Sequence, residues 1–341
     1  MTAKIKQIHP VFVGEVSDVD LREPLSAEDV QIIDEGMARY GVLVFHGQNI
    51  TDEQQAAFSR NFGELELPGK ISNITKSEDR RLGPEMADVS NLDKDNKPLG
   101  RDDRTRMFNL GNRLWHSDSS YKVVPAKYSL LSGRIVTEEG GETQFADMRA
   151  AYDALDQKTK ELIEDMVCEH SLIYSRGTLG FDELSEEELK NFNPVLQSLV
   201  RTNPDSGRKS IYLSAHIGCI IGAPRPEGLS LIRDLAEDAT RPEFVYTHKW
   251  QQFDLVVWDN RSTMHRARAF DDVNEIRDMR RTTIAGEGPT VEQAVAALRA
   301  TDTVIRALPE DAHTDPASKG CDRQLVKRDG QWVVEPLADK S

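Results

Sequence analysis

The sequence predicts a β-sandwich or β-barrel with helices packed on its outside. Runs rich in β-branched and aromatic residues, which are typical of strands, occur in both halves of the chain. Helical segments interrupt these runs, but not in the regular alternation that βαβ units and a parallel sheet require. The chain also has no internal repeat. Together these features favour a mainly β core with flanking helices.

The N-terminal part is expected to form two strands, each followed by a helix. The strands are residues 11–16 and 41–47, both rich in valine and phenylalanine. The first helix is expected to begin after Ser26, where acidic residues precede an apolar rhythm of helical period. Thr51 and Gln54 have the spacing of a capping box, so they predict the start of the second helix.

Residues 64–112 differ from the segments on either side of them. They are rich in Gly, Pro, Asp, Asn and Arg and show little periodicity. A stretch of this length without regular structure is usually a functional loop, a lid or a disordered segment.

The rest of the chain is predicted to form strands with helices between them. The expected strands are 128–136, 211–216, 243–250, 254–260 and 280–286. The expected helices are 148–155, 159–166, 185–192, 226–239 and 290–300. After the last helix follows a polar tail, in which only 331–334 resembles an ordered strand.

Composition excludes several classes of protein. The 341 residues carry 43 Lys and Arg against 58 Asp and Glu, a net charge of −15, which argues against a nucleic-acid binder or a protein docked on an anionic membrane. No window of about 18 apolar residues is present, so no membrane span is expected. No signal peptide is visible, and the three cysteines form no CxxC pair, so we expect a protein of the reducing cytoplasm.

One short segment could carry metal chemistry. In LWHSDSSY (114–121), His116 and Asp118 lie two residues apart and would share one face of a strand. With His265 downstream they match the two-His, one-carboxylate facial triad of non-haem Fe(II) oxygenases. Considered singly, the pair could be a surface hydrogen bond, and His265 could be a packed core histidine.

A basic run follows His265. Arg277 and Arg281 lie four residues apart, and Arg280 and Arg281 lie where a strand should begin. A guanidinium matches a carboxylate in both geometry and charge, so an arginine here could hold an acidic co-substrate. Thr143 could add a hydroxyl to the same carboxylate. The alternatives are a solvated basic run and a turn residue after two glycines.

The chain resembles a known family in several stretches that occur in order. They are NRLWHSDSSY, PAKYSLLSG, GGETQFADMRAAYDAL, SGRKSIYLSAH, EFVYTHKW and DLVVWDNRSTMHRARAFD. These resemble the 2,4-dichlorophenoxyacetate dioxygenase branch of the taurine dioxygenase superfamily, over about residues 5–286. Members depend on Fe(II) and 2-oxoglutarate and use O₂. The resemblance therefore implies a double-stranded β-helix core, also called a jelly roll or cupin-like fold, with outer helices.

The resemblance also implies roles for individual residues. His116, Asp118 and His265 would be iron ligands. Thr143 and Arg277 would hold the distal carboxylate of 2-oxoglutarate, and we expect Arg281 to meet the acidic group of the prime substrate. The spacing from His265 to Arg277 is one residue longer than is usual in the family, so the arginines are assigned from the strand that follows them. Arg280 remains a rival to Arg281.

Further residues could line the substrate pocket. Lys70 and Lys76 lie in the 64–112 segment, which would form the lid, and they could add positive charge for an anionic substrate or be solvated loop lysines. His216 could face the pocket or be a buried structural histidine. The implied organisation is a single dioxygenase domain at 1–288 and an appended helix and tail at 289–341. A homo-oligomer, dimer or tetramer, is expected.

The expected reaction is hydroxylation of a small anionic substrate with release of succinate and CO₂. An aryloxyacetate such as 2,4-dichlorophenoxyacetate is favoured, and ether cleavage would then give a phenol and glyoxylate. A taurine or alkylsulfonate dioxygenase, or a hydroxylase of another small carboxylic acid, is the nearest alternative. A cupin-like metal hydrolase and a binding barrel without activity are the alternatives from other classes.

Overall fold

A seven-stranded sheet forms one side of the core in the computed structural model, which describes residues 2–67, 73–181, 183–291, 323–328 and 331–336. The strand order is β1 (Lys4–Gln7), β2 (Gly14–Ser17), β3 (Val42–Phe45), β13 (Leu255–Asp259), β5 (Ala126–Ile135), β15 (Asp278–Ala285) and β4 (Ala87–Asp88). Neighbouring strands are antiparallel except β2 and β3, which are parallel. Strands far apart in sequence therefore lie side by side, as a jelly roll requires.

Smaller sheets form the other side of the core. Their strand orders are β12 (Val245–His248), β6 (Thr143–Asp147), β14 (Thr263–Ala267); β11 (Ile217–Ile220), β7 (Val167–His170), β8 (Val195–Ser198); and β10 (Lys209–Ile211), β9 (Val200–Thr202). Residues 115–116 lie between β14 and the turn that leads into β11, because His116 exchanges backbone hydrogen bonds with His265 and Trp115 O accepts one from Ala215 N. Phe145 of β6 packs with Val256 and Trp258 of β13, so apolar side chains fill the space between the layers.

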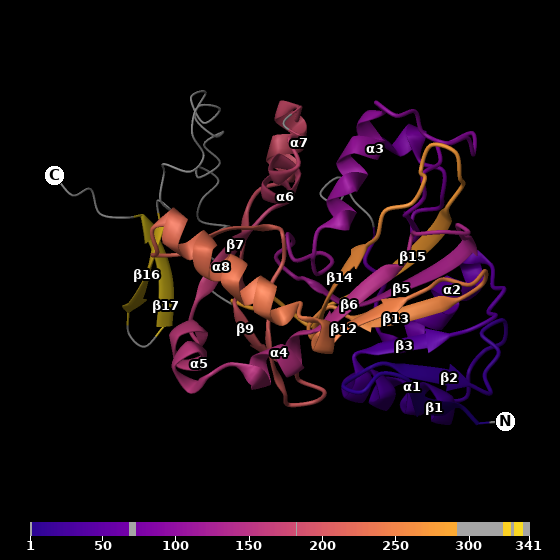
Figure 1. The fold of residues 1–341 in the computed structure, drawn as a ribbon, viewed down its shortest axis with the longest axis horizontal. Coiled ribbons are helices and arrows are strands. Elements are labelled where there is room, and N and C mark those ends of the chain that lie inside the picture. The colour runs from indigo at the N-terminus through magenta and orange to yellow at the C-terminus, as the bar shows by residue number, and fades with distance from the viewer. Residues whose placement is uncertain (1, 68–72, 182, 292–322, 329–330, 337–341) are drawn as a thin grey trace.

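Helices cover both outer faces (Figure 1). On the large sheet lie α1 (Ala27–Tyr40) and α2 (Asp52–Ser59), whose buried faces join one core cluster with strand residues. Near the smaller sheets lie α4 (Met148–Ala154), α5 (Gln157–Ile163) and α8 (Arg225–Ala239). Two predicted starts are confirmed: the Ser26 hydroxyl accepts from Asp29 N, and Thr51 and Gln54 form the expected capping box. No helix of the described residues is long and apolar enough to cross a membrane.

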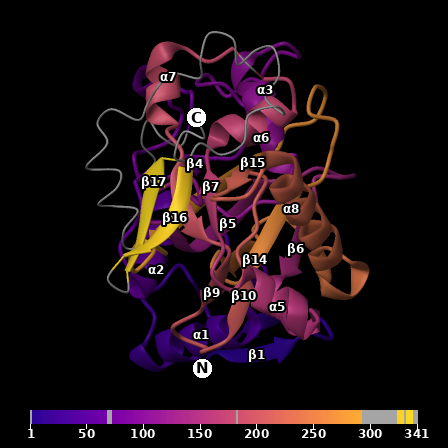
Figure 2. The ribbon, with the colours of Figure 1, turned by 90° about the vertical axis from the view of Figure 1, so that its left-hand side faces the viewer.

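The segment 64–112 contains more regular structure than predicted. It includes the short helix α3 (Arg104–Asn109), the 3₁₀ turn η2 (Ser77–Asp79), the start of the 3₁₀ turn η3 (Leu110–Arg113) and strand β4. Another 3₁₀ turn, η1 (Arg60–Phe62), precedes the segment. Arg104 of α3 forms an ion pair with Glu188 of α7 (Glu186–Asn191). In both ribbon views α3, α6 (Leu172–Thr178) and α7 stand together above the strands (Figures 1 and 2).

Other predictions were wrong or incomplete. The strand predicted at 211–216 ends at Ile211, because residues 212–216 turn towards β11. Strands β6, β7, β8, β9, β11 and β14 and helix α6 were not predicted. The predicted helix 290–300 lies almost wholly outside the described residues, and the strand predicted at 331–334 is part of a hairpin of β16 (Arg323–Arg328) and β17 (Gln331–Pro336). A 3₁₀ turn, η4 (Pro242–Phe244), precedes β12.

Candidate active site

His116, Asp118 and His265 come together beside β14, an edge strand of the sheet formed by β12, β6 and β14. Each is buried, and one ligand-type atom from each lies within 4.8 Å of the others. His265 is on β14, and His116 pairs with it across a single bridge, with backbone N···O distances of 3.0 and 2.8 Å. The expectation that His116 and Asp118 share a strand is wrong, because Asp118 lies in a turn that continues through Ser119 at φ 54°. The turn nevertheless aims the carboxylate at the two imidazoles.

The two imidazoles direct the same ring nitrogen at the carboxylate. His116 Nε2 lies 3.8 Å from Asp118 Oδ1, and His265 Nε2 lies 3.7 Å from Asp118 Oδ2. His116 Nδ1 donates to Leu114 O at 2.7 Å, so the proton is on Nδ1 and the lone pair is on Nε2. Two imidazole lone pairs and one carboxylate, all buried, are a donor set that fits Fe(II).

The protonation states of these groups also fit a cation. Burial and the neighbouring His116 hold the pKa of His265 well below its ordinary value, and burial lowers the pKa of His116 as well. Burial alone would raise the pKa of Asp118, but Arg281 and the two imidazoles keep it below its ordinary value. The set is therefore ready to bind a metal at neutral pH, because a metal ligand must carry a free lone pair.

Two neighbours fix the orientation of the Asp118 carboxylate. Ser129 Oγ donates to Oδ2 at 2.7 Å, and Arg281 Nη1 donates to Oδ1 at 2.5 Å. Asn260 supports both the turn and the serine, since its Oδ1 accepts from Asp118 N and its Nδ2 donates to Ser129 Oγ. Ser129 and Asn260 were not predicted as site residues, because a serine inside a strand and an asparagine after one carry no local signal.

Arg280 and Arg281 point to opposite faces of β15, as neighbours in a strand must. The Arg281 guanidinium reaches Asp118, whereas Arg280 forms ion pairs with Asp52 at 2.8 Å and with Asp278 at 3.1 Å. The structure therefore brings Arg281 to the site and does not bring Arg280 there.

Arg277 is a buried guanidinium without an acidic partner among the described residues. Its Nη2 donates to Gly141 O at 3.1 Å, and burial alone lowers its pKa to about 10. A buried cation of this kind is costly unless an anion joins it. Thr143, two residues beyond Gly141, accepts a 3.0 Å hydrogen bond from Trp250 Nε1 on its hydroxyl oxygen. The Thr143 hydroxyl proton is therefore directed to another acceptor.

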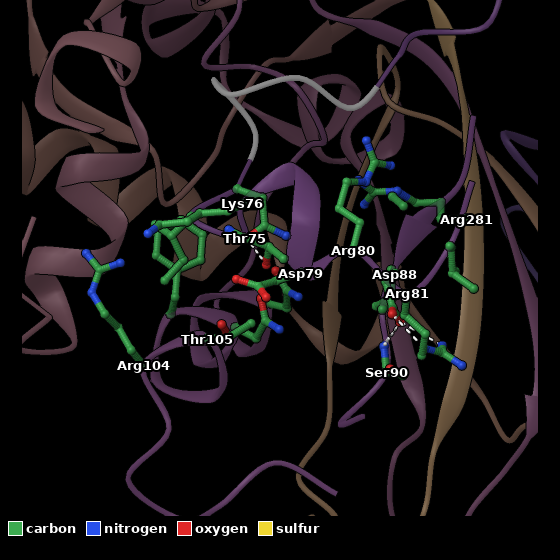
Figure 3. A pocket seen from close by; sticks show the side chains of 18 of the residues that line it. Thr75, Lys76, Asp79, Arg80, Arg81, Asp88, Ser90, Arg104, Thr105 and Arg281 are labelled. Carbon is green, nitrogen blue, oxygen red and sulfur yellow. Dashed lines mark hydrogen bonds and ion pairs between the residues drawn. The ribbon is translucent and has the colours of Figure 1, made fainter. Parts of the chain in front are cut away.

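A cavity of about 1000 Å³ opens beside the three clustered residues. Its described lining includes Lys76, His116, Asp118, His216 and Arg281. In Figure 3, Arg80 and Arg281 lie on one side of the cavity, Arg104 lies on the other, and Lys76 lies between them. The described lining does not include Thr143, Arg277 or Arg280, and Lys70 lies outside the described residues.

His216 lies close to the site as well. Its ring centroid is 5.8 Å from that of His116 and 5.2 Å from that of Tyr121, which also lines the cavity. Burial, together with Arg176 and His116, holds the pKa of His216 well below its ordinary value, so the imidazole is neutral. Neither Arg176 nor Tyr121 was predicted as a site residue.

Comparison with known proteins agrees with this geometry. A family model described as "Taurine catabolism dioxygenase TauD, TfdA family" matches residues 4–283. The chain belongs to the TauD/TfdA dioxygenase family. A second family model, for the C-terminal domain of the ATP phosphoribosyltransferase subunit HisZ, matches residues 284–335, beyond the dioxygenase match.

Three known proteins illustrate what the chain is similar to. An alpha-ketoglutarate-dependent 2,4-dichlorophenoxyacetate dioxygenase of Cupriavidus pinatubonensis is 43% identical over 83% of this chain and 98% of its own length. An (S)-phenoxypropionate/alpha-ketoglutarate-dioxygenase of Sphingobium herbicidovorans is 38% identical over 75% of this chain and 86% of its own. The crystal structure of AAD-2 in complex with Mn(II) and N-oxalylglycine is 58% identical, with a TM-score of 0.83 over 85% of this chain and all of AAD-2.

These findings confirm the family resemblance, the jelly-roll fold and the enzyme class. The protein is a non-haem iron dioxygenase that uses Fe(II), 2-oxoglutarate and O₂. A cupin-like metal hydrolase does not agree with the family, and neither does a binding barrel without activity.

Proposed function

We propose that this TauD/TfdA-family dioxygenase hydroxylates a small aryloxyalkanoic acid, with an aryloxyacetate such as 2,4-dichlorophenoxyacetate as the favoured substrate. The observation that carries the proposal is the Arg281 guanidinium, which lines the cavity directly beside Asp118. A cation there would bind a carboxylate through charge-assisted hydrogen bonds. The names of the two curated relatives support an aryloxyalkanoate over other acids.

In this proposal, the chain supplies separate groups for metal, co-substrate and substrate. His116, Asp118 and His265 would hold Fe(II), and Arg277 and Thr143 would hold the far carboxylate of 2-oxoglutarate. When bound, Fe(II) with 2-oxoglutarate and O₂ supplies the oxidation of a C–H bond to an alcohol, with release of succinate and CO₂.

Arg281 then decides which C–H bond is presented. An aryloxyacetate has one CH₂ group, between its ether oxygen and its carboxylate. A carboxylate held by Arg281 would bring that CH₂ close to Asp118 and the two imidazoles. Hydroxylation there gives a hemiacetal that breaks down to a phenol and glyoxylate. Lys76 and His216 line the same cavity and would contribute to the substrate pocket.

Further proposals concern the protein as a whole. We propose a catalytic domain at 1–288, with 64–112 as its lid, and an appended segment at 289–341. We also propose a homo-oligomer, dimer or tetramer, in a reducing cytoplasm, where the buried thiols of Cys168 and Cys219 would stay reduced. Light scattering on the purified protein measures the subunit number.

The experiment that tests the function is a substrate panel. The protein is incubated with Fe(II), ascorbate and 2-oxoglutarate, and succinate release is measured for 2,4-dichlorophenoxyacetate, both phenoxypropionate enantiomers, taurine and a longer alkylsulfonate. We expect the highest kcat/KM for an aryloxyalkanoate, with equimolar phenol formed. A clear preference for a sulfonate would replace this proposal with the alkylsulfonate alternative.

The ligand assignment is tested in the same assay. Asp118→Ala is expected to abolish succinate release, because it removes one of the three proposed ligands and leaves Arg281 unpaired. Asp156→Ala is a matched control, since that carboxylate only caps helix α5 at the surface. Full activity of Asp118→Ala would disprove the proposed triad.

A further inference from the structure

Arg176, on helix α6, is a buried arginine that lines the active-site cavity and has no role in the function described so far. Its side chain lines the same cavity as His116, Asp118 and Arg281, although the residue is only 5% exposed. A charged group in such a place requires an explanation, because charged side chains are rarely buried without a partner.

The packing around Arg176 fixes the plane of its guanidinium. The Phe108 ring lies on one side, with its centroid 4.4 Å from Cζ. Gly111 lies close by, and a Cβ at that position would come within 2.4 Å of Cζ. Nη1 donates to Ser175 Oγ at 3.0 Å. The guanidinium is therefore held in place before any ligand arrives, which lowers the entropic cost of binding one.

The charge of Arg176 is not compensated within the described residues. Arg149 and Arg261 are buried to a similar degree, but each forms a bidentate pair with a carboxylate, Asp147 and Asp259 respectively. Arg176 has no ion pair in the described part of the chain, and its Nε has no hydrogen-bond partner there. Burial lowers the pKa of Arg176 to about 10, so it is still a cation at neutral pH.

Arg176 and Arg281 lie near the same part of the cavity. Both arginines line the cavity beside His116, and both lie near enough to Tyr121 to interact with it. Tyr121, His216 and His116 follow one another at ring distances of 5.2 and 5.8 Å. The two guanidinium groups therefore lie around one aromatic surface of the cavity.

We propose that Arg176 and Arg281 together bind the acidic group of the prime substrate. The inference rests on the proposed function and adds a residue to it. Arg281 already donates one of its nitrogens to Asp118, so it offers only part of its fork to a substrate. A carboxylate has two oxygens and about four acceptor sites, which one partly occupied guanidinium does not satisfy. Arg176 supplies the remaining donors and the second positive charge.

The test measures substrate binding without turnover. The enzyme is loaded with Fe(II) and 2-oxoglutarate under anaerobic conditions, and titration calorimetry gives the Kd for 2,4-dichlorophenoxyacetate. In Arg176→Gln we expect the Kd to rise at least about tenfold, because a charge-assisted hydrogen bond is lost. The Kd for 2-oxoglutarate is expected to change less than about twofold. Phenoxyethanol, which lacks the carboxylate, should bind both proteins alike.

Two further variants separate binding from packing. Arg201→Gln is a matched control, because Arg201 stacks on Tyr212 at 4.6 Å in the same way but does not line the cavity. It should leave the Kd unchanged. Arg176→Lys keeps the charge but not the planar fork, so its Kd should lie between those of the wild type and Arg176→Gln. If Arg176→Gln does not fold, the Kd of Arg176→Lys provides the test instead.

The possible outcomes are distinct. An unchanged Kd for the acid in Arg176→Gln and Arg176→Lys, with a lower melting temperature, would show a packing role and overturn the inference. A larger effect on 2-oxoglutarate than on the acid would overturn it as well. If the wild type binds an alkylsulfonate and no aryloxyacetate, the proposed function fails, and the same variants test Arg176 with the sulfonate. A wild type that binds no acid overturns both.

Discussion

At the scale of single residues, two arginines four positions apart point to different places because strand β15 begins between them. Arg277 comes just before the strand and turns towards Gly141, whereas Arg281 lies within it and points at Asp118. A shift of one residue would exchange Arg281 for Arg280 and turn the charge to the opposite face. The register with β5, in which Arg281 pairs with Leu131, prevents that exchange.

The proposed roles, Arg281 for the prime substrate and Arg277 for 2-oxoglutarate, predict separate effects on the two KM values. Arg281→Ala should raise the KM for the prime substrate by roughly tenfold or more, and more than it raises the KM for 2-oxoglutarate. Arg277→Ala should show the reverse order. Initial rates with each substrate varied in turn measure both constants. Arg280→Ala is the control, since this neighbouring arginine pairs with Asp52 and Asp278 away from the cavity. If Arg281→Ala affected 2-oxoglutarate more, the two roles would have to be exchanged.

Trp250 should position the Thr143 hydroxyl. Its Nε1–H occupies one acceptor site of Thr143 Oγ1, so the hydroxyl proton of Thr143 is free to bind a carboxylate. Trp250→Phe keeps an aromatic ring against His248 but removes the donor. We expect the KM for 2-oxoglutarate to rise about threefold to tenfold.

The control for Trp250 is Tyr246→Phe, which also removes one polar hydrogen near His248, at 3.4 Å, but does not contact Thr143. The KM for the prime substrate should stay constant in both variants. Equal KM values for 2-oxoglutarate in Trp250→Phe and the wild type would exclude a positioning role for the indole.

At the scale of secondary-structure elements, the sequence predicted the features that depend on contacts between residues close together in the chain. The caps of α1 and α2 depend on residues three positions apart, so the sequence contained the whole interaction. Strand β14 and helix α6 were not predicted. β14 depends on pairing with β6, more than a hundred residues away, and α6 is a single short stretch of seven residues. Arg176 was missed because its helix was missed.

The same distinction applies to the candidate site. His116, Asp118 and His265 could be selected from the sequence because their residue types and order match a known motif. Ser129 and Trp250 could not, because their contacts with Asp118 and Thr143 join positions 11 and 107 residues apart. Nothing in the sequence near either residue indicates a partner so distant.

Strand β4 connects the 64–112 segment to the core through a partly buried network of charges around Asp278. Arg81 donates to Asp88 of β4 and to Asp278 of β15, and Arg280 also donates to Asp278. Removing one member of a buried network leaves the other charges poorly compensated. Asp278→Asn should therefore lower the free energy of unfolding by roughly 2 kcal/mol at pH 7, since Arg81 keeps its pair with Asp88.

The pH dependence of this effect has a definite sign. Burial alone would raise the pKa of Asp278, but hydrogen bonds from Arg81 and Arg280 hold it below the ordinary value of 3.8. The stability that the carboxylate contributes is thus complete above pH 3.8 and is lost as the pH falls further. Urea unfolding at pH 7 and at low pH should show the wild type and Asp278→Asn converging in acid. A difference that persists there would exclude the ion pairs as its cause.

At the scale of the whole molecule, the net charge of −15 is negative, whereas the arginines that line the cavity are positive. Composition argued against nucleic acid, because that interaction needs a broad basic surface. It gave no information about a small acid, since Arg176 and Arg277 are buried, Arg281 is only partly exposed, and the three contribute little to the surface. The charge of the ligand that a cavity favours depends on the few charged side chains in and around it, and not on the net charge of the protein.

The chain continues to contact the core beyond the proposed end of the catalytic domain at residue 288. Thr290 Oγ1 accepts from Ser198 N and donates to Gln197 Oε1, and Thr290 O accepts from Ser198 Oγ. Val291 is buried in a cluster with residues of β7, β8 and β11. The contacts with β8 therefore continue through Val291, three residues beyond the predicted boundary.

Two shortened chains test this boundary. A chain that ends at Val291 keeps every contact just described, so its melting temperature and kcat/KM should match those of the full chain. A chain that ends at Gly288 loses one buried valine and three hydrogen bonds, and its free energy of unfolding should fall by about 3 kcal/mol. Because Gln197 of β8 donates hydrogen bonds to Ser120 O and Lys122 O, in the turn that follows Asp118, the chain that ends at Gly288 should also have a lower kcat/KM. An inactive chain ending at Val291 would show that the last fifty residues belong to the catalytic domain after all.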